Sequence, residues 1–357
     1  MKIKIGILGF LIIFVLVFST CDLFDDNKDN KNNGNDVMVI VEPLTKTKWG
    51  QGNPYNSMFP IVGSTRPETG CGLIATAQIM KFHSNPLKYN EVYFEWGDML
   101  NSYTNIFNEK QSNAVATLVY HLREVKNTPL YSWAIVLANL GYDRSVQLLY
   151  REYYDDVSWE EIIKTQLDAG LPVYYWGINS ANTLDHAFII DGYDNSGKFH
   201  INWGWYGEHD GYYSLNTLNP KGLDLSHKQH IIVNIKSNKG STGSNEMALM
   251  AFSSKTTVLQ NEQFTVTAQL RSTGFFTGGQ AGVALVDNGG NIVEVIRFIN
   301  FNALDPESWR GITLNNCSIS TTGQYRLMIV SKHTDGEWKK VSLAHSGIQN
   351  SIVLEVQ

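Results

Sequence analysis

Hydrophobic and polar positions follow two different patterns along this chain. Residues 44–236 combine helix-like spacing of apolar side chains with short strand-like runs, whereas residues 246–357 show only short β-type runs separated by turn residues. Small polar residues fill the interval 237–245, a composition typical of a linker. The pattern therefore predicts an α+β domain at 44–236, followed after the linker by an all-β sandwich domain at 246–357.

Within the α+β domain, helices are predicted to precede most of the sheet. Apolar residues at helical spacing predict a helix over residues 72–82. Ser158, followed by Glu161 three residues later, has the pattern of a capping box and predicts a second helix that runs to Leu167. Strands are then expected at 171–175, at 186–193 and at 198–203, the last two joined as a hairpin.

The C-terminal domain is predicted to be an antiparallel sandwich of the immunoglobulin-like type. Two segments, Asn-Gly-Gly at 288–290 and Thr-Asp-Gly at 334–336, have the composition of hairpin turns. The strands of this domain are expected at residues 263–270, 282–285, 292–298, 325–330 and 351–356.

The N-terminus has the pattern of an export signal. Lys2 and Lys4 precede an apolar run over residues 5–18, and small residues then lead to Cys21. A transmembrane anchor is the alternative, but the run is shorter than the roughly 20 residues that span a bilayer. Residues 1–20 are therefore predicted to be a lipoprotein signal peptide, because their end resembles a bacterial lipobox in which Cys21 is lipidated.

Residues 21–43 are predicted to be mainly a polar tether. Asp, Asn, Lys and Gly dominate the first part, which offers almost no surface to bury. The acidic start after Cys21 resembles the surface-export signal of lipoproteins in Gram-negative gut bacteria, and a plain hydrophilic spacer is the alternative. We expect an exported protein, held by its lipid at the outer membrane or cell surface of a Gram-negative bacterium, with the periplasmic face as the other possibility.

The composition argues against a nucleic-acid-binding protein, a disordered protein and a small disulfide-rich protein. The 28 basic and 34 acidic residues give a formal charge of −6, which argues against a nucleic-acid partner held through phosphate contacts. The chain is 43% hydrophobic, enough to fill a core and to exclude wholesale disorder. Three cysteines are too few for a disulfide framework, so each thiol needs its own explanation. We expect a monomer.

Cys71 is the first candidate for chemistry. It follows Gly70 at the start of the predicted helix over 72–82, where free backbone N–H groups and the helix dipole favour an anion. Such a position lowers the pKa of a thiol. The alternative is a buried cysteine that packs as a small hydrophobic residue, as we expect for Cys317.

His186 and Asn202 are the second and third candidates. An imidazole at the start of a half-buried strand can serve as a base, although a hydrogen-bonded core histidine is the commoner case. Asn202 supplies an amide that could fix the imidazole tautomer, and the neighbouring indole of Trp203 could shield that bond from water. Counting along the hairpin places Asn202 opposite Ile189, so contact with His186 requires a bend or a bulge.

Gln51 completes the set. It lies 20 residues before Cys71, and its side-chain amide could stabilise an oxyanion together with the backbone N–H of Cys71. The alternative is an ordinary loop glutamine.

Five ordered motifs together resemble the streptopain family of papain-fold cysteine peptidases over roughly residues 45–236. They are Gln51 with Asn53-Pro54-Tyr55-Asn56, Thr69-Gly70-Cys71 with the helix to His83, Pro172-Val173-Tyr174-Tyr175, His186-Ala187-Phe188, and Asn202-Trp203-Gly204-Trp205.

The resemblance implies hydrolysis of peptide bonds in a protein or peptide substrate through a thioester. Cys71 would be the nucleophile, His186 the base and then the acid, Asn202 the residue that orients the imidazole, Trp203 its shield and Gln51 the oxyanion donor. Cys71 and His186 would form a thiolate–imidazolium pair.

Two further residues are candidates for substrate contact. Asp185 precedes the base and places a negative charge at the rim of the expected cleft. Trp205 could line that cleft, with plain packing as the alternative. No cofactor and no metal are expected: His227 and His230 have metal-compatible spacing but no accompanying ligand cluster, so they are predicted to be solvated.

The segment between Cys21 and Gln51 is shorter than the folded pro-domain usual in the family. We therefore expect that any inhibitor is a separate protein. A binding lipoprotein, whose β domain engages a partner while the papain-like domain is a scaffold, is the alternative to an endopeptidase.

Overall fold

The computed structural model describes residues 37–126, 132–244, 246–343 and 347–357, and those from Val37 onward form one compact unit. The predicted signal peptide, the lipidation site Cys21 and most of the predicted tether lie outside the described residues. No helix in the described part of the chain has the length and apolar character needed to cross a bilayer.

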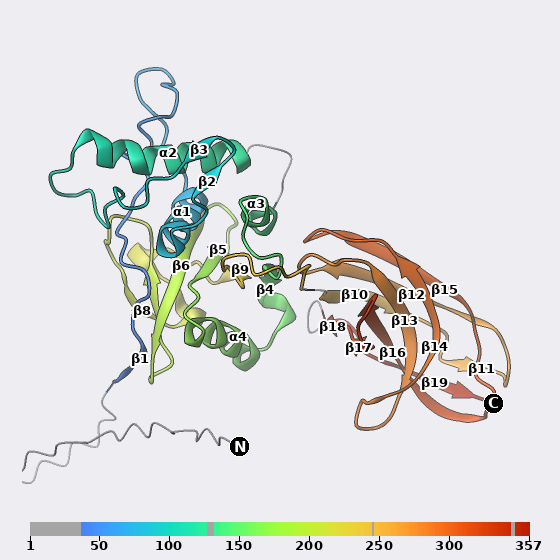
Figure 1. The fold of residues 1–357 in the computed structure, drawn as a ribbon. Helices are drawn as coiled ribbons and strands as arrows, with labels where there is room; N and C mark the ends of the chain where they lie inside the picture. The colour runs from blue at the N-terminus through green and yellow to red at the C-terminus, as the bar shows by residue number, and fades with distance from the viewer. Residues whose placement is uncertain (1–36, 127–131, 245, 344–346) are drawn as a thin grey trace, which may run out of the picture. The chain divides into compact units, whose positions relative to one another are not determined.

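Helices gather in the N-terminal part of the chain (Figure 1). A helix near residues 72–82 was predicted and is confirmed, whereas the sequence pattern missed the long helix that follows it. The α-helices are α1 Cys71–His83, α2 Glu109–Lys126, α3 Trp133–Asn139 and α4 Asp156–Asp168. Short 3₁₀ turns occupy Arg151–Tyr153, Leu215–Thr217 and Pro220–Gly222.

The start of α4 corrects the predicted cap. Asp155 is the N-cap residue, and its side chain accepts a 2.7 Å hydrogen bond from the backbone N–H of Ser158. The helix therefore begins before Ser158, because Asp155 satisfies a free N–H group one turn earlier than the predicted capping box.

An antiparallel sheet forms the centre of the N-terminal part, with strand order β4-β9-β5-β6-β7-β8 and with β1 paired to β6. Its strands are β1 Val39–Val41, β4 Gln147–Tyr150, β5 Val173–Ile178, β6 Asp185–Asp194, β7 Phe199–Asn202, β8 Gly211–Tyr213 and β9 His227–Val233. A separate small hairpin joins β2 Lys88–Tyr89 to β3 Val92–Tyr93.

Alternate residues of this sheet pack on opposite faces. Tyr174 and Ile189 belong to the core shared with α1, α2 and α3, whereas Tyr175 and Phe188 belong to the core shared with α4. Figure 1 shows α4 on the other side of the sheet from α1. The period of two along each strand thus divides the apolar side chains between two cores.

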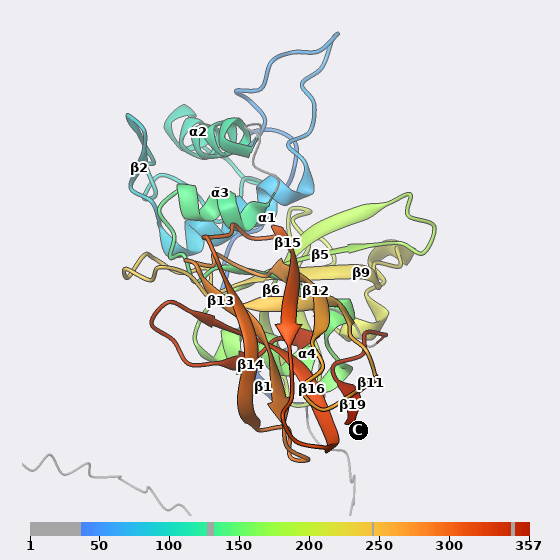
Figure 2. The same ribbon diagram turned by 90° about the vertical axis from the view of Figure 1, so that its right-hand side faces the viewer.

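The C-terminal part consists of two mostly antiparallel sheets around a mainly aliphatic core (Figures 1 and 2). The predicted fold class, an α+β papain-like region followed by a β sandwich, is confirmed. One sheet contains β15 Trp309–Cys317, β12 Phe264–Ser272, β10 Met247–Ser253 and β18 Ser342–Leu343 in that order. The other contains β11 Thr257–Val258, β19 Ile352–Val356, β16 Gly323–His333, β13 Gly279–Val286 and β14 Ile292–Phe301, with β17 Lys339–Lys340 paired to β16.

The edge strand β4 meets the sandwich. The backbone N–H of Leu148 donates a 2.8 Å hydrogen bond to the carbonyl of Thr273, and Gln147 forms a bridge with Gly274. The segment predicted as a free linker is also held, since Asp143 accepts a 2.9 Å bond from the backbone N–H of Lys239. Backbone pairing of this kind satisfies groups that an uncovered edge strand would leave exposed.

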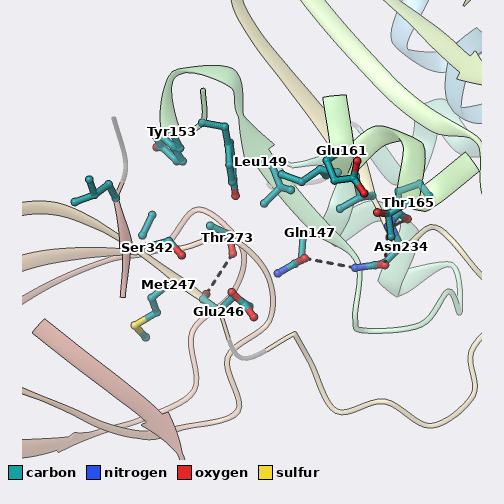
Figure 3. Close-up of a pocket in the computed structure, with 16 residues that line it drawn as sticks. Gln147, Leu149, Tyr153, Glu161, Thr165, Asn234, Glu246, Met247, Thr273 and Ser342 are labelled. Carbon is teal, nitrogen blue, oxygen red and sulfur yellow. Dashed lines mark hydrogen bonds between the residues drawn. The ribbon is translucent and has the colours of Figure 1, made fainter. Parts of the chain in front are cut away.

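A cavity of about 320 Å³ lies beside this junction (Figure 3). Gln147, Glu161 and Thr273 are among the residues that line it, and none of the predicted site residues does. The chemistry predicted for the chain is therefore located elsewhere.

Candidate active site

The first helix presents Cys71 to the sheet. Cys71 is its first residue, and Gly70 before it has a φ of 92°, a conformation that favours glycine. The thiol is half-buried and is in hydrogen-bonding contact with the backbone N–H of Ala187 on β6. Because Ala187 directly follows His186, the nucleophile and the base predicted from the sequence come from neighbouring points of α1 and β6.

His186 is held through one ring nitrogen. Its Nε2 lies 2.8 Å from the carbonyl oxygen of Trp203, and the imidazole is only 5% exposed. Since a carbonyl only accepts, Nε2 carries the proton and Nδ1 of the neutral ring is left as the acceptor. This tautomer can receive a proton from a thiol.

Asn202 does not contact the imidazole. Asn202 pairs with Ile189, as the hairpin count predicted, so these two side chains lie on the same face of the sheet. His186 lies three residues before Ile189 on the same strand, so its side chain points to the opposite face. The Asn202 amide instead donates to the carbonyl of Thr47 at 2.7 Å and pairs with Gln78 of α1. The predicted direct bond from Asn202 to His186 is therefore absent from the described contacts.

Trp205, rather than Trp203, is the tryptophan whose ring lies nearer to the imidazole. The ring of Trp205 lies 4.6 Å from the imidazole centroid, whereas the ring of Trp203 lies 6.3 Å away and packs against Phe188 at 4.6 Å. Trp205, predicted to contact substrate, is thus the nearer indole cover of His186. Trp203 reaches the imidazole through its backbone carbonyl.

Gln51 lies in a loop that is tied to the approach to Cys71. Its backbone carbonyl accepts a 3.0 Å bond from the N–H of Thr69, two residues before the nucleophile. Its side-chain amide bonds to no other described residue, which leaves the amide N–H groups free to donate to a ligand.

Tyr206 holds this loop from the other side. Its hydroxyl accepts a 2.8 Å bond from the N–H of Gly52, and its ring lies where a Cβ at Gly50 would clash, at 2.4 Å. The sequence pattern predicted Tyr206 only as a packing residue, with cleft lining as the alternative, and did not connect it with the Gln51 loop.

Burial sets the resting protonation of the site. Burial raises the pKa of the Cys71 thiol, the Ala187 N–H lowers it, and the Asp185 carboxylate raises it again. Burial lowers the pKa of His186, although its bond to Trp203 acts in the opposite direction. Burial thus opposes the charged form of both groups, whereas the N–H groups at the start of α1 act in the other direction on the thiol.

Asp185 lies exposed at the start of β6, beside the base. Its Oδ2 accepts a 2.8 Å hydrogen bond from the indole N–H of Trp176. This bond restrains the carboxylate on the residue next to His186, and its place at the rim of a substrate cleft stays a prediction.

Comparisons with known proteins match the part of the chain that contains these residues. Residues 49–213 match the Peptidase C10 family. This part of the chain is thus similar to the streptopain family of cysteine peptidases. The resemblance predicted from the motifs is confirmed.

Individual relatives support this assignment to the Peptidase C10 family. Streptopain from Streptococcus pyogenes is 30% identical over 232 residues, which cover 52% of this chain and 58% of streptopain. The thiol protease/hemagglutinin PrtT of Porphyromonas gingivalis is 29% identical over 210 residues, which cover 49% of this chain and 24% of that protein. The match therefore spans little more than half of streptopain and a quarter of PrtT.

A solved structure gives the same result for the fold. The active interpain A cysteine protease of Prevotella intermedia has 27% sequence identity and a TM-score of 0.51, and the match covers 59% of this chain and all of that chain. The papain-like fold predicted for the C10 region is confirmed by this match.

The other candidate groups fall outside the C10 site. Cys317 is buried in the sandwich, where its thiol donates to the carbonyl of Leu314. His230, predicted to be solvated, is half-buried and stacks on Trp176 with ring centroids 4.7 Å apart. His227 lies near Asp224, and no group of three His, Cys, Asp or Glu side chains suited to a metal occurs in the described part of the chain.

Proposed function

We propose that this chain is a cysteine endopeptidase that hydrolyses peptide bonds in proteins or peptides. The observation that carries the proposal is the pairing of two elements. The thiol of Cys71 is within hydrogen-bonding reach of the backbone N–H of Ala187, the residue after His186. The imidazole is bound through Nε2, so Nδ1 is left to act as the base.

In the proposed reaction, Sγ of Cys71 attacks the carbonyl carbon of the scissile bond while its proton passes to Nδ1 of His186. The resulting imidazolium gives that proton to the leaving amine as the C–N bond breaks, which leaves a thioester on Cys71. Water, deprotonated by the same imidazole, then attacks the thioester and releases the acid product.

Two donors are proposed to stabilise the oxyanion of each tetrahedral intermediate. One is the backbone N–H of Cys71 at the positive end of α1, and the other is the free side-chain amide of Gln51. The bond from Thr69 to the Gln51 carbonyl supports the proposal, because it restrains the Gln51 loop beside the nucleophile.

Asp185 and Trp205 are proposed to contact substrate at the opening of the site. The Asp185 carboxylate would favour a cationic group on the substrate nearby. Trp205 offers a partly exposed indole face next to the imidazole.

We further propose that the protein is exported and held to a membrane by a lipid on Cys21. Support comes from the basic and apolar signal pattern and from the polar stretch that follows Cys21. Replacement of Cys21 by Ala should abolish incorporation of radioactive fatty acid during growth. Continued incorporation in the Cys21→Ala variant would contradict the anchor.

The peptidase proposal is tested by two assays on the purified chain. We expect hydrolysis of an internally quenched peptide and covalent labelling by an epoxysuccinyl inhibitor, both lost in Cys71→Ala. A folded chain that neither hydrolyses nor is labelled would favour the binding-lipoprotein alternative.

A further inference from the structure

The carbonyl of Trp203 determines the tautomer of His186, so whatever fixes that carbonyl also fixes the base. Trp203 lies directly after β7 in a loop that the sheet does not restrain. Side chains must therefore hold the two peptide groups that flank Trp203.

Both peptide groups are held. The N–H of Trp203 donates a 2.9 Å bond to Oδ1 of Asp210, and the N–H of Gly204 donates a 3.1 Å bond to Oδ1 of Asn202. The second of these N–H groups belongs to the same planar peptide as the Trp203 carbonyl. Asn202 therefore orients the Trp203 carbonyl, which accepts the hydrogen bond from the imidazole, although Asn202 does not contact the ring.

Gln78 in turn holds Asn202. Its Nε2 donates to Oδ1 of Asn202 at 3.2 Å, and its Oε1 accepts from Nδ2 of Asn202 at 3.2 Å and from the backbone N–H of Trp49 at 3.2 Å. Gln78 is 0% exposed in the middle of α1, and Asn202 is 2% exposed. A buried amide pair with this many bonds has a single favourable arrangement.

The loop also requires a glycine at 204. Gly204 has a φ of +71°, and a Cβ there would lie 3.2 Å from Ile74 and 3.8 Å from Nε2 of Gln78. The positive φ and the close packing on α1 bring the 203–204 peptide to the amide pair.

We propose that Gln78 is a positioning residue for catalysis, which acts on His186 through Asn202 and the Trp203–Gly204 peptide, with Asp210 as a second support of the same carbonyl. This inference rests on the proposed peptidase function. Without the Gln78 side chain, the Nε2–H group of His186 loses its fixed acceptor. The neutral ring then also populates the tautomer in which Nδ1 is protonated and cannot accept a proton from the thiol.

The chain provides a matched control in Gln229. This glutamine is also buried, at 3% exposed, and its Nε2 donates to the carbonyls of Leu215 and Leu225. It has no bond to Trp203, Asn202 or His186 in the described contacts. Gln78→Met and Gln229→Met each remove one buried amide at similar volume, but only the first breaks the connection to the imidazole.

The experiment combines kinetics with NMR of the histidine ring nitrogens in the full chain labelled with ¹⁵N-histidine. We expect Gln78→Met to lower kcat by about ten- to a hundredfold with little change in KM, and to shift the His186 ring from the Nε2–H form to a mixture of tautomers. Gln229→Met should lower thermal stability by a similar amount and leave both the tautomer and kcat unchanged.

Asp210 gives an independent test if Gln78→Met does not fold. Asp210→Asn keeps an acceptor for the Trp203 N–H and should retain the wild-type tautomer, whereas Asp210→Ala should not. Equal kinetic losses in the Gln78 and Gln229 variants, or an unchanged tautomer in Gln78→Met and in Asp210→Ala, would overturn the proposal. Inactivity of the wild-type chain with the Nε2–H tautomer intact would instead contradict the peptidase function alone.

Discussion

The two folded parts of the chain bury different kinds of side chain. In the described residues, all the buried polar side chains lie between residues 37 and 236, the part of the chain that contains the C10 region, except Ser272, Thr273 and Ser331. The core of the sandwich is aliphatic, with residues such as Val266, Val283 and Leu314 fully buried. Burial of a polar group is destabilising unless the group is hydrogen-bonded. In the C10 region, buried groups such as Gln78 and Asn202 are therefore hydrogen-bonded.

The two kinds of core limit the choice of residue to different degrees. An aliphatic core needs only volume and shape, and many sequences satisfy it. A buried hydrogen-bond network needs particular donors and acceptors at particular positions. Two of the exceptions in the sandwich, Ser272 and Thr273, lie next to the junction with β4, where Thr273 accepts from Leu148. We therefore expect substitutions in the C10 region to act on catalysis and those in the sandwich to act on stability.

The largest effect is expected at the nucleophile and base. Cys71→Ala and His186→Ala should each lower kcat/KM by on the order of 10⁴-fold or more, because each removes a group that acts in every step. Circular dichroism should show an unchanged fold. Residual activity within tenfold of wild type in either variant would place the chemistry elsewhere.

The sandwich core should show the opposite response. Leu314→Ala opens a cavity at a fully buried position and should reduce the free energy of unfolding by about 2–5 kcal/mol. At a temperature where the variant is folded, kcat/KM should equal that of wild type. The measurement is urea unfolding paired with a peptidase assay, and a fall in kcat of the folded variant would show that the sandwich contributes to the site.

Asn202→Ala should have an intermediate effect on catalysis. It removes the acceptor of the Gly204 N–H but no group that transfers a proton, so kcat should fall by about ten- to a hundredfold, less than in His186→Ala. The comparison of the two variants under one substrate decides the division of roles. Equal losses would make Asn202 as necessary as the base.

The titration of His230 should make the stability of the chain depend on pH, because Arg271 of the sandwich lies near this histidine of the N-terminal part. His230 stacks on Trp176, and burial together with the nearby Arg271 of the sandwich lowers its pKa to about 4. Because the unfolded histidine takes up a proton below about 6.5 while the folded one stays neutral, stability should be lost as the pH falls from about 6.5 towards 4.

The variant His230→Phe keeps the ring and removes the titration. It should reduce the acid-side loss by about 1–2 kcal/mol in unfolding measured at pH 7 and pH 4.5. An unchanged pH dependence in His230→Phe would assign the loss to other groups, such as His83, whose pKa burial also lowers.

The smallest effect is expected from the charge beside the base. The Asp185 carboxylate raises the pKa of Cys71, so Asp185→Asn should lower it and speed alkylation by iodoacetamide at pH 8 by a fewfold, about 2–5-fold. In wild type, the alkylation rate should keep rising to pH 9 or above, because burial raises the thiol pKa. An inflection well below pH 8 would restore the thiolate–imidazolium pair expected from the helix start. Cys317 should react far more slowly, since it is buried.

Local sequence determined the elements around the site and the identity of its reactive groups. Apolar spacing predicted the helix that begins at Cys71, and the turn between β6 and β7 fixed the register that sets Asn202 opposite Ile189. Turn residues and short β-type runs predicted most strands of the sandwich. These features depend on neighbours along the chain, which a single sequence contains.

Which side chains contact one another across the fold depends on the packing of distant segments. The alternation of strand faces places Asn202 away from His186 and towards Gln78 on α1, and the backbone carbonyl of Trp203 accepts the hydrogen bond from the imidazole. Burial reversed the effect expected of the helix start on the Cys71 pKa. The contacts of Asn202 and the pKa of Cys71 both depend on segments that are distant in the sequence and exclude water from the site. A local sequence pattern contains no information on either.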